Sequence, residues 1–172
     1  WASRVSGDAV YTSVASRHAH TLAAVLVRRD GSTAQSVHFD RASGRILFIH
    51  THQGLSTTST WSRGQGWAVY GFSQLAQQLR DGALLRVALR AGAYVARHLP
   101  SGGVPRWDYD ASAGAPIDVS AGVITAAGLE HLSAACRAMP GVCGGSAGRW
   151  SALGRRMLAA ALAHARTQPP LG

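Results

Sequence analysis

Apolar residues recur at the spacing of helical turns over five segments of the chain. A spacing of i, i+3, i+4 and i+7 places side chains on one face of an α-helix. The pattern predicts helices over about 8–22, 60–79, 82–99, 117–136 and 147–166. The faces expected to be buried carry Tyr11, Val14, Ala15 and His18 on the first helix, Leu84, Val87, Ala91 and Tyr94 on the third, and Trp150, Leu153, Met157 and Ala161 on the fifth. Ser6 or Asp8 is expected to cap the first helix, and Asp118 the fourth.

Between the first two helices the pattern changes to one typical of strands. The segments 24–28, 36–40 and 45–51 are rich in β-forming residues, and the pairs Asp30-Gly31 and Ser43-Gly44 between them are turn signals. The sequence therefore predicts a small antiparallel insertion on a helical scaffold. Residues 101–116 show no period and are expected to form a loop, and the tail from Thr167 is expected to fray.

Alternating short and long connections between the helices indicate stacked helical hairpins. A hairpin with its loops takes roughly 50–60 residues, so 172 residues hold about three. We predict an all-α class and one partial domain over 1–172. Because the chain begins at Trp1 with no initiating Met, we expect it to be cut from a longer protein.

The composition is that of a soluble globular protein, with 47% hydrophobic and 15% charged residues. No apolar stretch is expected to reach the roughly 20 residues needed to span a bilayer, so no membrane association is expected. The net charge of +9 raises nucleic-acid binding as an alternative. All 17 basic residues are arginines, however, and they are dispersed along the chain. An anionic small substrate explains the surplus equally well, and no nucleic-acid partner is expected.

Cysteine and histidine give little evidence of a metal site. Cys136 and Cys143 are too few for a zinc site, and although a disulfide between them is sterically possible, two unlinked thiols are the preferred interpretation. His18 and His20 would not face each other on a helix. His50 and His52 would share a strand face without a carboxylate or Cys nearby in the sequence. No metal is expected.

The densest group of functional residue types lies at 51–70, THQGLSTTSTWSRGQGWAVY. On a helix, Arg63, Trp67 and Tyr70 share one face. An indole offers a flat platform for a sugar ring, and a guanidinium can hold a carboxylate through two parallel hydrogen bonds. The alternative is a buried aromatic helix in which Arg63 stacks on Trp67. Gly64 and Gly66 are poor helix formers, which indicates close approach to the backbone.

These residues carry a family resemblance that covers almost the whole chain. The matching segments in order are Trp1-Ala2-Ser3, Val27-Arg28, Asp30-Gly31-Ser32-Thr33, Phe39-Asp40 with Ser43-Gly44, Thr51-His52-Gln53-Gly54, Ser59-Thr60-Trp61-Ser62-Arg63-Gly64-Gln65-Gly66-Trp67, Tyr70-Gly71-Phe72, Gly103-Val104-Pro105, Trp107-Asp108-Tyr109-Asp110, and Asp118 with Ser120-Ala121. The chain resembles the unsaturated glucuronyl hydrolases, glycoside hydrolase family 88. The resemblance implies part, about half, of an (α/α)6 six-hairpin barrel, with no metal or organic cofactor.

The resemblance also implies an activity. Enzymes of this family remove 4,5-unsaturated uronic acid from oligosaccharides produced by polysaccharide lyases. An acid/base Asp protonates the C4=C5 vinyl ether bond and water adds at C5, which differs from the paired-carboxylate displacement of ordinary glycosidases. The expected partner is therefore an unsaturated uronic-acid-containing oligosaccharide, and the expected location is the cytoplasm.

Carried over by motif, Gln53, Arg63 and Trp67 match substrate-contacting positions. Gln35 stands where the family pattern DGSTxH carries a substrate-contacting His, and Gln hydrogen-bonds but does not titrate near neutral pH. His38 is a candidate to compensate, although strand alternation would turn it to the other side. Trp61 and Gln65 match the motif as well, with a scaffold role equally weighted.

The acid/base Asp of the family would lie upstream of Trp1, so no catalytic residue is expected within this chain. Asp108 and Asp110 are the only clustered carboxylates. On an extended loop they would point to opposite sides, and bracing of the loop is preferred over catalysis. Two alternatives stay open: a non-catalytic carbohydrate-binding remnant, and an unsaturated rhamnogalacturonyl hydrolase with the same fold and reaction type.

Overall fold

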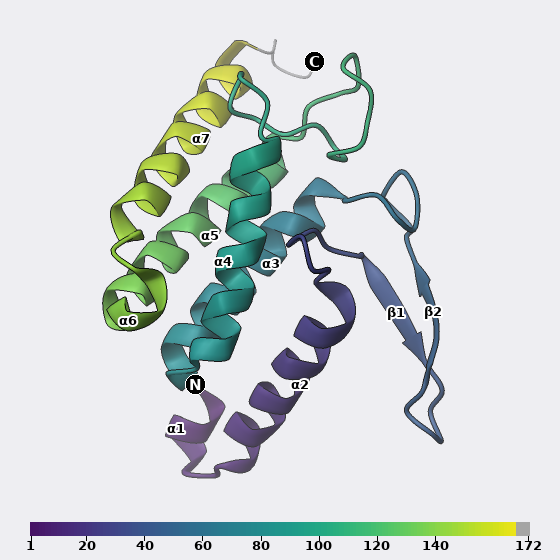
Figure 1. Ribbon diagram of the computed structural model, residues 1–172, viewed down its shortest axis with the longest axis vertical. Coiled ribbons are helices and arrows are strands. Elements are labelled where there is room, and N and C mark those ends of the chain that lie inside the picture. Colours follow the sequence, from purple (N-terminus) through teal and green to yellow (C-terminus); the bar gives the residue numbers. More distant parts are fainter. Residues whose placement is uncertain (168–172) are drawn as a thin grey trace.

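The computed structural model describes residues 1–167 and consists of seven helices and one hairpin (Figure 1). The elements in order are α1 (Ala2–Ser6), α2 (Val10–Leu26), β1 (Ser36–Phe39), β2 (Ile46–His50), α3 (Ser62–Leu79), α4 (Gly82–His98), α5 (Val119–Ala138), α6 (Pro140–Cys143) and α7 (Ala147–Thr167). The five long helices agree with the expected segments to within a few residues, whereas α1 and α6 were not predicted. The expected fraying of the tail beyond Thr167 lies outside the described residues.

Two parallel helices, α3 and α5, form the centre of the fold. A Cβ added to Gly66 would lie 2.7 Å from Thr125 Oγ1, and one added to Gly128 would lie 2.7 Å from the Tyr70 backbone nitrogen. From the first contact to the second, residue numbers rise in both helices. The helices therefore run parallel, and their N-termini lie at the same end. Side chains at these two positions would push the helices apart, since interiors are close-packed.

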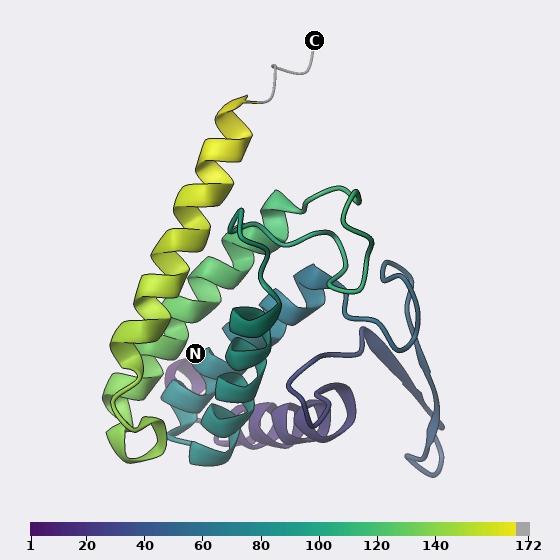
Figure 2. The same cartoon turned by 45° about the horizontal axis from the view of Figure 1, so that its top comes forward.

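The helices α4 and α7 cover this central pair, and each follows its partner in a hairpin (Figure 2). Arg80 ends α3 with a φ of 55°, and the Asp81 carboxylate then caps α4 by accepting hydrogen bonds from the backbone nitrogens of Ala83 and Leu84. The side chains predicted to face the core are buried in both helices, except that Leu153 is partly buried: Leu84, Val87, Ala91 and Tyr94 in α4, and Trp150, Met157 and Ala161 in α7.

The first long helix, α2, is far less buried than its pattern predicted. Tyr11 and Val14 were expected in the core but are each 51% exposed, and Ala19 is the helix's only buried residue. The reason is that α2 meets α3 along its C-terminal half, while its first turns meet only the short helix α1, through hydrogen bonds between Thr12 and Ser3. A hydrogen bond of 2.7 Å between His20 Nε2 and Asp81 Oδ2 ties α2 to the start of α4.

The predicted insertion is an antiparallel hairpin that stands beside the helices (Figure 1). Ser36 pairs with His50 and His38 with Phe48, and Gly44 adopts a φ of 70° in the turn, as the turn signal predicts. The strand expected over 24–28 is wrong. The helix α2 continues to Leu26, and only Val27 forms an isolated bridge, with Thr33.

One described helix, α5, is long and apolar enough to cross a membrane by length and composition alone. The sequence expectation that no such stretch exists is therefore wrong. In the fold, 56% of this apolar stretch of α5 is buried, as expected for a helix in the core of a protein. The apolar surface of α5 is used in packing against α3 and α7.

The preference for two unlinked thiols is also wrong, because Cys136 and Cys143 form a disulfide with a Cα–Cα distance of 5.4 Å. The short helix α6 reverses the chain after α5, and this brings the two sulfurs together. Both cysteines are buried. Disulfides persist mainly in oxidising compartments, so the bond argues against the expected cytoplasmic location, which stays a prediction.

We predict that reducing this disulfide destabilises the chain. Closing a ring with a sequence separation of 7 contributes about 2.5 kcal/mol to the free energy of unfolding, through the entropy of the unfolded chain. Urea denaturation with and without a reductant measures the effect. The double variant Cys136→Ala/Cys143→Ala is the control, and its stability should not respond to reductant. A wild-type chain that is equally insensitive, or that gives two free thiols on titration, contradicts the bond.

Candidate active site

The N-terminal ends of α3 and α5 meet two long connections, 51–61 and 99–118. A short antiparallel pairing of Trp61 with Asp108 joins the two connections, and a second one, between Arg106 and Ile117, closes the longer connection on itself. The backbone nitrogen of Ser62 donates to Trp107 O at 3.1 Å, and that of Tyr109 donates to Thr60 O at 2.9 Å. Most of the predicted site residues lie at this end of the helix pair.

Arg63 links the two central helices. Its Nη1 donates to Asp118 Oδ2, and its guanidinium lies over the Trp61 ring, with 4.8 Å from Cζ to the ring centroid. The stacking of Arg63 on Trp67, considered from the sequence, is thus replaced by stacking on Trp61. Arg63 keeps 33% of its side chain exposed, whereas Asp118 is 6% exposed. A guanidinium has five N–H donors, so most of them stay available to an anion.

Trp67 presents a bare indole one helical turn further along α3. It is 52% exposed, and its ring meets Tyr70 edge to face with centroids 5.9 Å apart. Tyr70 in turn contacts the ring of His131 on α5 at 4.7 Å. Large aromatic side chains with this exposure are suited to stacking on an apolar ring face.

Trp61 and Gln65, the two residues left open from the sequence, serve mainly as scaffold. Gln65 is fully buried, and its Nε2 donates to Gly31 O and Ala91 O, which fixes the Asp30-Gly31 turn against α4. The Trp61 ring lies between Arg63 and Gly64, where an added Cβ would be 3.0 Å from the indole. The glycine at 64 therefore allows the close approach that its poor helix propensity indicated.

Gln35 and Gln53 form a pair at the mouth of the site. Gln35 Nε2 donates to Gln53 Oε1 at 3.1 Å. Gln35 Oε1 accepts from Thr51 Oγ1 at 2.6 Å, from His52 N at 2.8 Å and from Gln53 N at 3.0 Å. The half-buried Gln35 amide thus holds the turn that carries the exposed Gln53.

His38 does not take the place of the missing family histidine. It lies on the other face of the hairpin from Gln35, and its ring stacks on Phe48 with centroids 4.3 Å apart. The rings of His50 and His52 continue this outer face, 4.4 Å from each other. Among the described residues no group of three or more His, Cys, Asp or Glu could hold a metal ion.

Asp108 is a structural carboxylate. It is fully buried; its Oδ2 accepts from Leu55 N at 2.9 Å and Ser59 Oγ at 2.8 Å, and its Oδ1 accepts from Asp110 N at 3.0 Å. Asp110 Oδ2 accepts from Thr60 N at 3.0 Å. Both carboxylates therefore brace the connections, as the preferred interpretation of the sequence held.

Two tyrosines at this end hold their protons more tightly than a free tyrosine does. Burial raises the pKa of Tyr109, and burial likewise raises the pKa of Tyr94 despite a hydrogen bond to Thr60. The Asp118 carboxylate accepts hydrogen bonds from Arg63 and from Ala121 N, and through the second bond it caps α5. In the described part of the chain, each of Asp108, Asp110 and Asp118 already has hydrogen-bond partners.

Arg28 is a further organising residue, which the family resemblance includes as part of Val27-Arg28 but to which sequence reasoning assigned no role. Its Nη2 donates to Thr57 O at 3.1 Å and Ser59 O at 3.2 Å, and its Nη1 to Thr33 O at 3.2 Å. The guanidinium thus fastens the connection before α3 to the Asp30-Gly31 turn. An arginine next to a turn signal has no distinctive pattern, which is why only the structure reveals this role.

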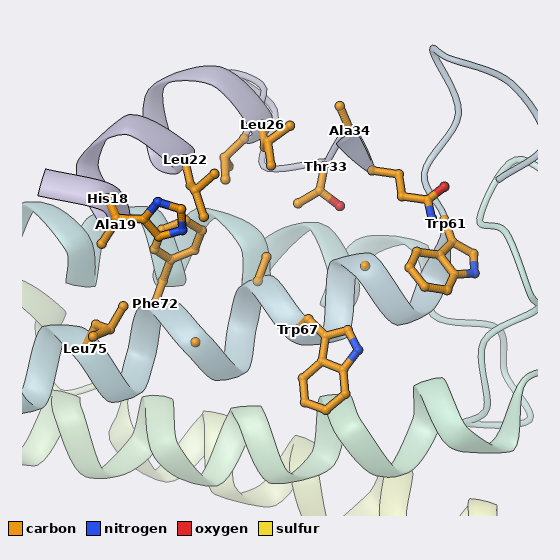
Figure 3. Close-up of a pocket in the computed structure, with 15 residues that line it drawn as sticks. His18, Ala19, Leu22, Leu26, Thr33, Ala34, Trp61, Trp67, Phe72 and Leu75 are labelled. Carbon is orange, nitrogen blue, oxygen red and sulfur yellow. The ribbon is translucent and has the colours of Figure 1, made fainter. Parts of the chain in front are cut away.

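A cleft of about 300 Å³ lies between α2 and α3 (Figure 3). Its walls are mostly apolar and include Leu22, Leu26, Phe72 and Leu75. Gln35, Trp61 and Trp67 line the other end of the cleft, near the start of α3. Neither Arg63 nor Gln53 lines it. Sugar sites need convergent polar groups, so this lining fits packing better than saccharide binding.

Known proteins of similar sequence cover about three quarters of this chain. The unsaturated glucuronyl hydrolase of Bacillus sp. (strain GL1) is 36% identical over 135 residues, 77% of this chain and 36% of that protein. The unsaturated chondroitin disaccharide hydrolase of Streptococcus agalactiae is 31% identical over 129 residues, 74% of this chain and 32% of that protein. No protein-family model matches the chain.

Solved structures show the same likeness in three dimensions. The crystal structure of the Bacillus sp. GL1 unsaturated glucuronyl hydrolase matches with a TM-score of 0.85 at 31% identity, over 93% of this chain and 42% of that chain. The chain belongs to the unsaturated glucuronyl hydrolase family. It spans about a third of the length of the curated relatives. As part of an unsaturated glucuronyl hydrolase fold, the helical pairs described above are a portion of an (α/α)6 barrel, as predicted.

We predict that Asp108→Asn lowers the free energy of unfolding by about 2 kcal/mol. Whichever way the amide turns, its NH2 group faces a backbone N–H, of Leu55 or of Asp110, and leaves that donor unpaired. Urea denaturation measures the loss. The matched control is Asp40→Asn, since Asp40 holds a similar turn through Ser43 but is only partly buried. Equal, small effects at both positions would contradict a structural role for Asp108.

Proposed function

We propose that the protein to which this chain belongs hydrates and removes 4,5-unsaturated uronic acid from short oligosaccharides. The observation that carries the proposal is the pairing of a half-exposed indole, Trp67, with a partly exposed guanidinium, Arg63, one turn apart on α3. A uronate presents an apolar ring face and a carboxylate, which are the two features that this pair complements.

The proposed division of labour gives this chain substrate binding rather than proton transfer. Asp118 holds Arg63 in place, and Gln53 adds a neutral hydrogen-bonding group at the edge of the same end. Because the neighbouring carboxylates are already hydrogen-bonded, the acid that protonates the C4=C5 bond comes from another part of the barrel. Protonation at C4 leaves positive character at C5, water adds there, and the resulting hemiketal opens to release the neighbouring sugar.

The apolar cleft supports this arrangement through the repeat of the fold. The helix α3 lies against α4 on one side and parallel to α5 on another. A further helix could lie against α3 as α5 does, in parallel, and pack against α2. Such a helix would fill the cleft between α2 and α3. Its N-terminal end would then reach the same end of the barrel as Arg63 and Trp67, which is a suitable place for the acid.

The test is turnover by a completed barrel. A chimera that joins residues 1–172 to the remaining segments of the Bacillus sp. GL1 enzyme is incubated with an unsaturated uronyl disaccharide. Loss of ultraviolet absorbance by the C4=C5 bond reports the reaction, and the saturated disaccharide is the substrate control. We expect turnover of the unsaturated sugar alone. A folded chimera that binds the sugar without consuming it would favour a non-catalytic carbohydrate-binding protein.

In this chimera, Arg63→Gln and Trp67→Ala are each predicted to raise KM about tenfold, equivalent to about 1.4 kcal/mol of binding. Both groups act on the bound sugar rather than on proton transfer, so kcat should change less than KM. Arg86→Gln, on the exposed outer side of α4, is the matched control. Steady-state kinetics separates the two constants, and an unchanged KM in both variants contradicts the assigned roles.

A further inference from the structure

The orientation of the Gln53 side-chain amide is fixed by its neighbours. Two backbone nitrogens, His52 N at 2.8 Å and Gln53 N at 3.0 Å, point at the same side-chain atom of Gln35. A backbone N–H can only donate, so that atom is the amide oxygen. The hydroxyl of Thr51 reaches the same oxygen at 2.6 Å.

The assignment at Gln35 determines the one at Gln53. With its oxygen turned to the Thr51–Gln53 turn, Gln35 presents Nε2, a donor, to the neighbouring amide at 3.1 Å. The atom of Gln53 that receives this hydrogen bond must be its oxygen. The Gln53 Nε2 group is then turned outward with both N–H bonds, and it makes no hydrogen bond with any described residue, while the residue itself is exposed.

We propose that Gln35 is a positioning residue that sets the polarity of Gln53 and makes it a dedicated hydrogen-bond donor to the sugar. The group that Gln53 meets must therefore be an acceptor, such as a carboxylate, ring or hydroxyl oxygen of the uronide. This role rests on the proposed function, and it differs from the direct substrate contact expected for Gln35 from the sequence.

The packing around Gln35 is consistent with positioning. Its carbonyl oxygen already accepts three hydrogen bonds and has no capacity for a fourth from a ligand. Its amide is half-buried, and the bond to Gln53 uses one of its two N–H groups. Without that bond the Gln53 amide would rotate freely, because the terminal torsion of a glutamine is broad.

The decisive variant is Gln35→Glu. A carboxylate keeps the three donors of the turn satisfied but offers no N–H to Gln53. The Gln53 amide then turns over to donate to the carboxylate, and its oxygen faces the ligand. Gln78→Glu, an exposed position near the end of α3, introduces the same charge without touching the site and is the matched control.

NMR signals of the side-chain amides in the 15N-labelled chain show which end of the Gln53 amide faces Gln35, without any ligand. In the wild type, we expect the Gln53 NH2 protons to exchange rapidly with water and one Gln35 NH2 proton to be protected. In Gln35→Glu, one Gln53 NH2 proton should shift downfield and become protected. Protection of Gln53 NH2 in the wild type would overturn the proposal, as would unchanged Gln53 resonances in Gln35→Glu.

Titration with an unsaturated uronyl disaccharide gives the second readout. We expect the sugar to shift the Gln53 amide signals of the wild type, and Gln35→Glu to weaken binding about tenfold while Gln78→Glu does not. Equal affinity of Gln35→Glu and the wild type overturns the role of Gln35. Absence of binding to every variant contradicts the proposed function instead, and the ligand-free amide pattern still decides the polarity of Gln53.

Discussion

Close backbone contact between α3 and α5 is the constraint on which the site depends. Gly66 and Gly128 let the two helices approach until Thr125 and Tyr70 fill the space that side chains would occupy. Because the helices are parallel, this contact also brings their N-termini together, and Asp118 at one can then hold Arg63 at the other. Larger residues at the two glycines would separate the helix ends and with them the binding groups.

The functional side chains around this helix pair divide into those that shape the site and those that face it. Asp108 and Arg28 are used up in fixing the two connections, through hydrogen bonds that the interior would otherwise leave unsatisfied. Arg63, Trp67 and Gln53 keep exposed donors or ring surface. The first group fixes the backbone connections beside the second, and a binding surface that is already ordered loses less entropy when a sugar binds.

The sequence predicts most of the fold because the core faces of α4 and α7 follow helical spacing strictly. It places α2 correctly but overestimates its burial, since Tyr11 and Val14 have the spacing of core residues and are each 51% exposed. The disulfide depends on the short helix α6. Its four residues are too few to show a helical repeat in the sequence. The motif locates Arg63 and Trp67, but the partners of Arg63 and the division of roles between Gln35 and Gln53 depend on contacts across 18 to 55 residues of sequence.

The central claim is that this chain holds the sugar without supplying the acid. The most direct test is to follow the chain and an unsaturated uronyl disaccharide together by proton NMR over several hours. The account predicts a shift of the Trp67 indole N–H signal on adding the sugar, with the vinyl proton signal of the sugar unchanged in intensity. Disappearance of the vinyl signal would contradict the account, because one of the carboxylates described as structural would then be acting as the acid.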